Sequence, residues 1–367
     1  MVADAEPPPA MMERVRRRHR RRTAWLAAAS VVTIVVLAAV VTPLALLPGQ
    51  VTHRSGVKPS AAGTAGTPSA RSSAPSVPSW AKRLPGEVVY KCENSICLMR
   101  PDGTGKRLVP GGATLPYPQG DPAWSPDGRR LAFRGYYGSG DGQYDLYMID
   151  TNGCHLTRLT HQVNGTSPSW SPTGRELAFT VGGIKVINVN GTGLRSLTKD
   201  YEDNSPAWSA GNRIAFVRTT RGTIRGEIYT INPDGSGQAA LTHGGPGFAE
   251  PSWSPTGRQI AFVALTGHSA ETGSPMAIEV ANADGSGLRR VSPRSWASYN
   301  PAWTPNGKIV FLRQIGAPTQ STAAPSSAYI VNPDGTGLRL LYPNLDGSQI
   351  AWGPTSLPRP TCLHIGQ

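Results

Sequence analysis

One short motif, Pro-x-Trp followed by a tight turn, recurs through the carboxyl-terminal part of the chain. The copies read Pro122-Ala-Trp-Ser-Pro-Asp-Gly128, Pro168-Ser-Trp-Ser-Pro-Thr-Gly174, Pro206-Ala-Trp-Ser-Ala-Gly211, Pro251-Ser-Trp-Ser-Pro-Thr-Gly257 and Pro301-Ala-Trp-Thr-Pro-Asn-Gly307, with a degenerate sixth, Ile350-Ala-Trp-Gly-Pro-Thr355. The six tryptophans lie 38 to 50 residues apart, which is the length of one four-stranded propeller blade. Residues 85–367 are therefore predicted to form an all-β, six-bladed β-propeller.

A second turn alternates with the first and divides each repeat into two hairpins. Clear copies are Ile231-Asn-Pro-Asp-Gly235 and Val331-Asn-Pro-Asp-Gly335. Pro at the second position and Gly at the fourth are typical of a type I turn that closes a short hairpin. Each repeat thus predicts four strands of four to six residues: A through the Trp, B through an apolar run such as Leu131-Ala-Phe133, C before the second turn, and D after it.

This pattern resembles the TolB-type β-propeller repeats, which are related to WD repeats. The resemblance spans about 280 residues and implies the propeller fold. A TolB protein would also carry an amino-terminal α/β domain, whereas this sequence has a different kind of segment there. The resemblance is therefore not taken to imply TolB's own partners.

The strand order predicts how the ring closes. Gly86–Tyr90 resembles a B strand with no A strand before it, while Gln349–Trp352 resembles an A strand with no B strand after it. We expect the carboxyl-terminal strand to complete the first blade, because closure removes the exposed sheet edges.

Four cysteines in an extracytoplasmic chain favour disulfides. Cys92 and Cys97 flank a tight B–C hairpin, Cys154 lies in a C–D turn of the second blade, and Cys362 follows the closing strand. Of the three possible connectivities, 92–97 with 154–362 is preferred, and free thiols are the alternative. No Cys or His spacing matches a zinc site, so neither a metal nor a cofactor is predicted.

The amino-terminal part predicts a membrane anchor. Residues 1–23 hold seven Arg and three acidic residues and are predicted to be a basic cytoplasmic tail. Residues 24–47 contain no charged side chain and would reach roughly 36 Å as a helix, enough to cross a bilayer. Residues 48–84 are rich in Pro, Ser, Ala and Gly and predict a disordered spacer. A cleaved signal peptide is the alternative to a retained anchor. Both place the propeller outside the cytoplasm, and the retained anchor predicts a single-pass protein of the cell membrane.

The net charge of +13 does not indicate nucleic-acid binding. Residues 1–85 contribute most of it, and residues 86–367 hold 24 basic and 20 acidic side chains. Phosphate binding needs positive charge gathered on one face of the domain. No nucleic-acid partner is predicted, and a monomer is expected.

Candidate binding residues lie where irregular loops would gather. The short A–B and C–D turns share one face of the predicted ring, and the longer B–C and D–A loops share the other, where binding is more common. The residue before the Pro of strand A should lie near the channel. Candidates for ligand or partner binding are Asp121, Tyr136, Tyr137, His161, Lys199, Tyr201, His243, Glu250, Trp296, Tyr299 and Asn300.

Each candidate also has a structural interpretation. Asp121 and Glu250 would begin opposite blades, too far apart for paired acid–base work, and could be solvated turn carboxylates. His161, Lys199 and His243 could be solvated loop residues, and the repeat tryptophans are expected to pack between blades. No nucleophile motif is present.

These features predict a membrane-tethered module that binds an envelope protein or a cell-wall glycan and is not an enzyme. The alternative is a propeller enzyme, of lactonase or glycan-lyase type, with a metal in its channel.

Overall fold

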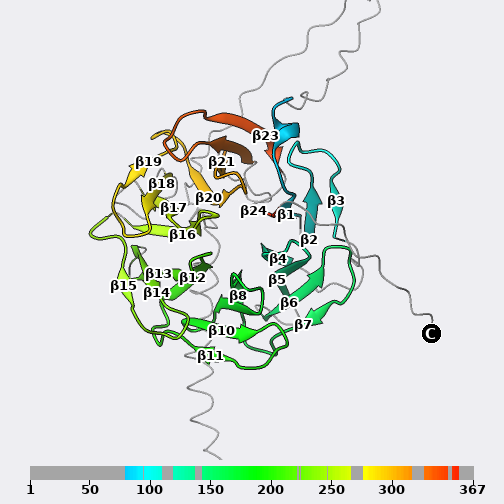
Figure 1. Ribbon diagram of the computed structural model, residues 1–367, viewed down its shortest axis with the longest axis vertical. Helices are drawn as coiled ribbons and strands as arrows, with labels where there is room; N and C mark the ends of the chain where they lie inside the picture. Colours follow the sequence, from blue (N-terminus) through cyan, green and yellow to red (C-terminus); the bar gives the residue numbers. More distant parts are fainter. Residues whose placement is uncertain are drawn as a thin grey trace, which may run out of the picture.

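The computed structural model describes residues 79–354 except for 94, 110–118, 137–142, 221–222, 224, 246, 266–275, 316–325 and 346–348. Within these residues the chain forms six four-stranded antiparallel sheets, arranged as blades around a central axis (Figure 1). The predicted six-bladed propeller is confirmed.

Each blade runs from an inner strand beside the axis to an outer strand at the rim. Blade 1 contains β24 (Ile350–Trp352), β1 (Val88–Cys92), β2 (Ser95–Met99) and β3 (Arg107–Leu108). Blades 2 and 3 contain β4 (Gln119–Trp124), β5 (Arg130–Tyr136), β6 (Tyr144–Asp150) and β7 (Thr157–Arg158), then β8 (Thr166–Trp170), β9 (Glu176–Thr180), β10 (Ile184–Asn188) and β11 (Arg195–Ser196). Blade 4 contains β12 (Asp203–Trp208), β13 (Ile214–Thr219), β14 (Gly226–Ile231) and β15 (Ala239–Ala240). Blades 5 and 6 contain β16 (Phe248–Trp253), β17 (Gln259–Leu265), β18 (Met276–Asn282) and β19 (Arg289–Arg290), then β20 (Ser298–Trp303), β21 (Ile309–Gln314), β22 (Ser326–Val331) and β23 (Arg339–Leu345).

The carboxyl-terminal strand closes the ring as predicted. β24 pairs with β1, with Trp352 opposite Val88 and Ile350 opposite Tyr90. The Trp352 indole N–H donates to the Pro85 carbonyl at 2.7 Å. At Gly86 (φ +94°) a Cβ atom would lie 2.3 Å from the Gly353 carbonyl oxygen, so this junction requires glycine.

The apolar core lies between adjacent blades. Five phenylalanines of the B strands, Phe133, Phe179, Phe216, Phe262 and Phe311, are fully buried. One core cluster joins Val217 of blade 4 to Phe262 of blade 5. The repeat tryptophans add polar links, because the Trp170, Trp253 and Trp303 indoles donate to carbonyls of the preceding inner strand. The expected packing role of the repeat tryptophans agrees with these contacts.

Most outer strands are shorter than predicted. Five of the six contain two residues, and β23 contains seven. In four of the short strands, a side-chain hydroxyl takes the place of a backbone carbonyl as hydrogen-bond acceptor near the end of the outer strand. The Thr160, Thr198, Thr242 and Ser292 hydroxyls accept hydrogen bonds from N–H groups at the start of the C strands.

The predicted Cys92–Cys97 disulfide is confirmed and crosses the β1–β2 hairpin. Cys154 is also disulfide-bonded. Its predicted partner, Cys362, lies outside the described residues.

The predicted basic tail and apolar segment, residues 1–47, and most of the predicted spacer also lie outside the described residues. In residues 79–354, apart from the gaps given above, no helix has the length and apolar character needed to cross a bilayer.

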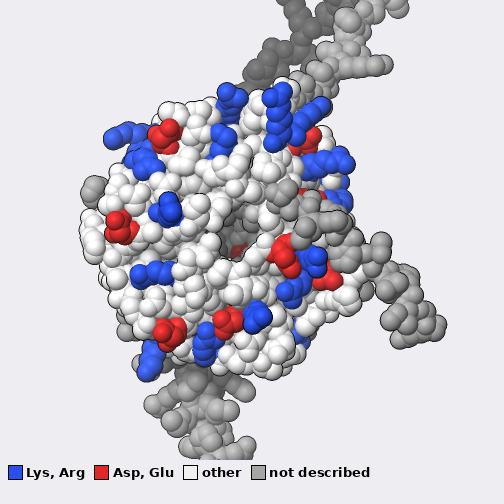
Figure 2. Space-filling model, viewed as in Figure 1, with Lys and Arg blue, Asp and Glu red and all other residues white. Residues whose placement is uncertain are grey.

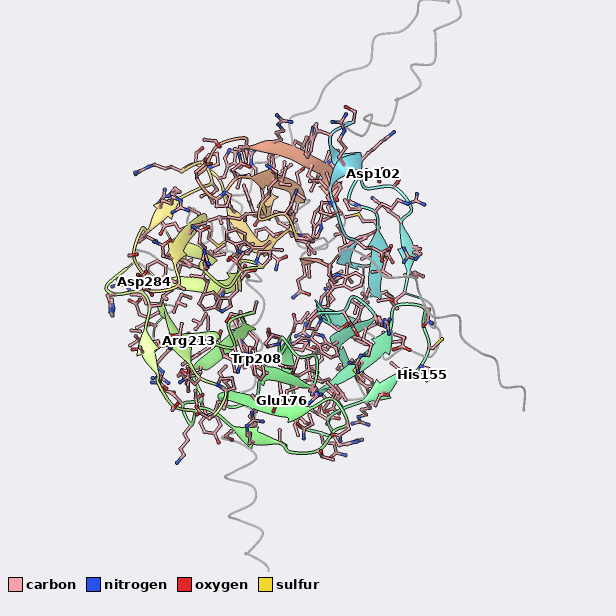
Figure 3. All side chains as sticks on the ribbon, viewed as in Figure 1. Asp102, His155, Glu176, Trp208, Arg213 and Asp284 are labelled. Carbon is pink, nitrogen blue, oxygen red and sulfur yellow. A yellow bond between two sulfur atoms is a disulfide. The ribbon has the colours of Figure 1, made fainter. Side chains whose placement is uncertain are left out.

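The two ends of each blade differ, as antiparallel pairing requires. The A–B and C–D turns form one face, called here the turn face, and the B–C and D–A loops form the other, called the loop face. Figure 3 shows the turn residues Asp102, Arg213 and Asp284 around the ring, with the repeat residue Trp208 closer to the axis.

The amino-terminal end of the described chain packs on blade 6 at the turn face. Ala81, in the short helix η1 (Ala81–Arg83), is fully buried, and Arg339 lies over the Trp80 ring at 5.4 Å. Trp80 and Leu84 line a cavity of about 280 Å³ together with Asn306 and Asn332, which belong to turns of blade 6. The chain therefore joins the propeller at its turn face.

Candidate functional site

The inner strands share a backbone feature that projects side chains at the axis. The residue before the strand's Pro has a positive φ of 51° to 52° in five blades: Asp121, Ser167, Ser205, Glu250 and Asn300. A register shift accompanies each one. Proline has no N–H for the ladder, so a bulge at this point loses little pairing. The left-handed conformation is strained for non-glycine residues, and such strain tends to be kept at functional positions.

These residues connect neighbouring blades through side-chain-to-backbone hydrogen bonds. The Asn300 N–H donates to Glu250 Oε2 at 2.6 Å, and the Ile350 N–H donates to Asn300 Oδ1 at 2.6 Å. The Asp121 N–H donates to Gln349 Oε1 at 2.7 Å, and the Ser167 N–H donates to Asp121 Oδ2 at 3.1 Å. The bonds fix four side chains around the channel, which Figure 2 shows as a hollow at the centre of the ring.

Asp121 is held in an ion pair. Arg134 Nε lies 3.4 Å from Asp121 Oδ2, and the two side chains are 14% and 7% exposed. The Arg134 guanidinium also lies 4.7 Å from the centre of the Tyr144 ring. A Cβ on Gly120 would approach Arg134 Nη2 to 2.9 Å, so glycine leaves room for the guanidinium. The interpretation of Asp121 as a solvated turn carboxylate is wrong, because strand B supplies a cation that encloses it.

The position of Arg134 differs between blades. The register of the A and B strands places Lys91, Arg134 and Thr180 at equivalent positions in blades 1 to 3. The equivalent residues in blades 4 to 6 are Val217, Val263 and Leu312. The polar residues at this position therefore all belong to three consecutive blades, and the apolar ones belong to the core between the other blades.

Burial and charge change the protonation of several channel groups. Burial raises the pKa of the Glu250 carboxyl, and the negative charge of Asp121 raises it further. Burial lowers the pKa of the Lys91 ammonium, as does the positive charge of Arg134, while Asp121 opposes them. Burial also raises the pKa of the Tyr299 hydroxyl. Asp121 and Glu250 interact across the channel, although they begin opposite blades.

The predicted candidates separate into two groups. Asp121, Glu250 and Asn300 come together at the channel, whereas the Tyr299 side chain does not: its ring packs against the apolar core and its hydroxyl lies 2.6 Å from Ser326 Oγ in the third strand of blade 6. The second group lies outside the channel: the loop residues His161, Lys199, Tyr201 and His243 are exposed, the loop residue Trp296 is partly buried, and Tyr136, also partly buried, ends β5. Tyr201 is 71% exposed, the largest such value among the exposed large apolar side chains. Tyr137 lies outside the described residues.

The sequence reasoning missed Lys91, Arg134 and Gln349. Lys91 and Arg134 stand in ordinary strand segments, and Gln349 directly precedes β24, at the position that Asp121 has in blade 2. Aligning the B strands by their Phe would have revealed that two cations occupy a position that is apolar in three other repeats.

Metal coordination is not supported by the described residues. Among them, no group of three or more His, Cys, Asp or Glu side chains is placed to hold a metal ion. The carboxylates of the channel instead accept hydrogen bonds from protein N–H groups, so they are already engaged by the fold.

Comparison with known proteins shows the fold. No family model and no curated protein matches the sequence. Among solved structures, TolB from Acinetobacter baumannii is similar with a TM-score of 0.59 and 20% identity, covering 73% of this chain and 67% of that one. A putative TolB from Agrobacterium tumefaciens is similar with a TM-score of 0.53 and 20% identity, covering 74% of this chain and 91% of that one. A chain of a nidogen/laminin complex is similar with a TM-score of 0.54 and 12% identity, covering 74% of this chain and 99% of that one. The likeness is one of fold.

Proposed function

We propose that this chain is an extracytoplasmic binding module, held at the cell membrane by residues 24–47 and presenting its loop face to a partner protein or cell-wall glycan. The observation that carries the proposal is the difference between the two faces. The turn face is regular and receives the amino-terminal segment through Trp80 and Ala81. The loop face carries the longer B–C and D–A connections, and the described part of the amino-terminal segment, residues 79–85, lies at the turn face.

The side chains of the loop face suit macromolecular contact. Tyr201 is largely exposed in the D–A loop between blades 3 and 4. Trp296, in the loop between blades 5 and 6, lies 4.5 Å from the Tyr329 ring and 4.1 Å from the Arg313 guanidinium, measured to ring centres. Aromatic and arginine side chains on a rigid scaffold are common anchors of protein interfaces. Propellers of the TolB and laminin-complex structures have the same fold, which is compatible with binding but does not identify a partner.

The proposal is tested by site-specific photo-crosslinking in intact cells. A photo-reactive phenylalanine analogue replaces Tyr201 on the loop face or Leu194 on the turn face; both belong to the blade 3 region, and Leu194 is 48% exposed. We expect a crosslinked partner from position 201 and none from position 194. Equal crosslinking from positions 201 and 194 contradicts the proposal. So does the absence of crosslinking from both loop positions tested, 201 and a second one at His161.

The membrane placement is tested separately. A cysteine introduced at Leu194 should react with a membrane-impermeant maleimide in intact cells, while one introduced at Ala10 should react only after permeabilisation. Reaction at both positions in intact cells contradicts the proposed orientation. A propeller enzyme with a channel metal remains the alternative, and stoichiometric metal in the purified full chain would favour it.

A further inference from the structure

Two neighbouring blades carry a cation at the same position of the B strand. Lys91 in β1 and Arg134 in β5 occupy equivalent B-strand positions of neighbouring blades, and β1 packs beside β4 of the next blade. The positive charge of Arg134 and the negative charge of Asp121 both act on Lys91. Lys91, Arg134 and Asp121 therefore form one electrostatic group, called here the channel cation group.

Among the residues that the structure describes, Asp121 is the one carboxylate that pairs with this group, and it has other partners as well. Asp121 pairs with Arg134 at 3.4 Å. It also accepts hydrogen bonds from the Ser167 N–H and from Gln349 Nε2. Among the described residues, the Lys91 ammonium has neither a hydrogen bond nor an ion pair. Counted over the described residues, the channel cation group thus has two cations and one carboxylate, an excess of one positive charge.

The fold does not require this excess. Blades 4 to 6 complete the same packing with Val217, Val263 and Leu312 at the equivalent positions. A partly buried cation without a partner is destabilising, because burial removes hydration that no contact replaces. A partly buried cation next to a second cation is typical of a site that binds an anion.

We propose that the channel beside Lys91 and Arg134 binds the carboxylate of a ligand. A carboxylate accepts hydrogen bonds from an ammonium and neutralises the excess charge. In blades 5 and 6 the Asn300 N–H occupies Glu250 Oε2 and the Ile350 N–H occupies Asn300 Oδ1, so the acceptor that Glu250 keeps for the ligand's other end is Oε1. The favoured ligand carries one carboxylate and, away from it, hydroxyl or N–H donors. This inference rests on the proposed binding function, because it names the chemistry of what is bound.

The first test observes Lys91 directly. The full chain in nanodiscs is reductively methylated with ¹³C, which keeps the charge on its lysines and gives each a separate methyl signal. Acetate is the probe, and acetamide is its neutral match in size. We expect the Lys91 signal, assigned by its loss in Lys91→Gln, to shift saturably with acetate and not with acetamide. The signal of Lys185, in the third strand of blade 3 from the axis, should stay fixed.

The second test uses the sign of the charge. Acetate affinity is measured by calorimetry in low-chloride buffer. Lys91→Gln should weaken it at least tenfold, and Asp121→Asn should strengthen it several-fold, because Asn keeps the Ser167 bond while freeing Arg134. Lys185→Gln is the control and should leave the affinity unchanged. A purely structural role of these residues would not give opposite signs. Equal effects of acetate and acetamide on Lys91, or a loss of affinity in Asp121→Asn, would overturn the proposal.

Failure of this site and failure of the binding function are distinguishable. If acetate has no effect while position 201 still crosslinks a partner, the carboxylate site is wrong and the loop-face function stands. If acetate binds with the expected signs and no loop position crosslinks a partner, the channel site stands and the macromolecular partner is wrong.

Discussion

Asp121 and Glu250 occupy the same backbone position in two blades, yet their surroundings give them different chemistry. Asp121 has Arg134 beside it and remains paired in a closed environment. Glu250 is equivalent to it but has Val263 at the place of Arg134. The backbone bulge sets the direction of each side chain, and one B-strand residue then decides whether a cation lies beside the carboxylate.

Glu250 should make stability depend on pH. Its folded-state pKa is raised above the usual value of 4.5, so the folded chain binds the proton more tightly than the unfolded chain. The contribution of the protonated Glu250 carboxyl to the free energy of unfolding is greatest below pH 4.5 and is lost as the pH rises through the folded-state pKa. Glu250→Gln cannot lose a proton and can still accept the Asn300 hydrogen bond. We expect the free energy of unfolding of Glu250→Gln to increase relative to that of the native chain as the pH rises above 4.5.

The measurement is urea unfolding of both chains from pH 4 to pH 8, on the order of five points, at constant ionic strength. Glu93→Gln, at an exposed site in the β1–β2 turn, is the matched control. A free-energy difference between Glu250→Gln and the native chain that stays constant with pH, or that follows the Glu93→Gln control, contradicts the assignment.

The indole hydrogen bonds should be measurable one blade at a time. The Trp303 indole donates to the Ser252 carbonyl at 2.9 Å, whereas the Trp124 indole N–H is buried and has no partner among the described residues. Trp303→Phe removes this hydrogen bond. Trp124→Phe removes only an unsatisfied donor. We expect Trp303→Phe to cost about 1 kcal/mol more than Trp124→Phe in chemical unfolding. Equal losses would show that packing alone accounts for the repeat tryptophans.

At the scale of strands and hairpins, the sequence was most informative where glycine, proline and tryptophan carry the signal. The turns, the blade count and the closing strand all followed from residues whose backbone demands are specific, such as the Pro and Gly of Asn332–Gly335. The outer strands were predicted too long because the hydroxyl of Thr160 or Thr198 bonds a backbone N–H that the pattern assigns to a longer ladder. The channel cation group was missed because its members come from different repeats and meet only in the ring.

The disulfide of the first hairpin should stabilise the chain only moderately. Cys92 and Cys97 are five positions apart, so their bond removes little entropy from the unfolded chain. The double variant Cys92→Ser with Cys97→Ser should lower the free energy of unfolding by about 2 kcal/mol, measured against native chain that stays oxidised. A much larger loss would show that the hairpin holds the closure between β1 and β24.

The closing strand should matter far more than its three residues suggest. Truncation after Ser348 removes β24 and exposes the edge of β1, while truncation after Pro354 keeps the pairing of Val88 with Trp352. Both truncated chains carry Cys154→Ser so that their thiols match. We expect the longer chain to unfold in one transition and the shorter one to lose cooperativity or to aggregate, since an open edge pairs with other chains. Similar unfolding curves for the two would contradict ring closure as the source of cooperativity.

At the scale of the whole molecule, the position of the amino-terminal junction relates the ring to the proposed anchor. Trp80 and Ala81 pack at the turn face, so a membrane attached through residues 24–47 lies on average nearer to that face. A flexible spacer of 48–79 would have a root-mean-square span of roughly 30 Å, so this preference is an average rather than a fixed distance.

Energy transfer from a donor at position 194 on the turn face to an acceptor in the nanodisc lipid should exceed that from position 201 on the loop face. Replacing Trp80 with Ala should free the junction from blade 6 and reduce this difference, while His161→Ala on the loop face should leave it unchanged. Greater transfer from position 201 would mean that the loop face turns toward the bilayer, and the partner would then have to be sought at the membrane surface.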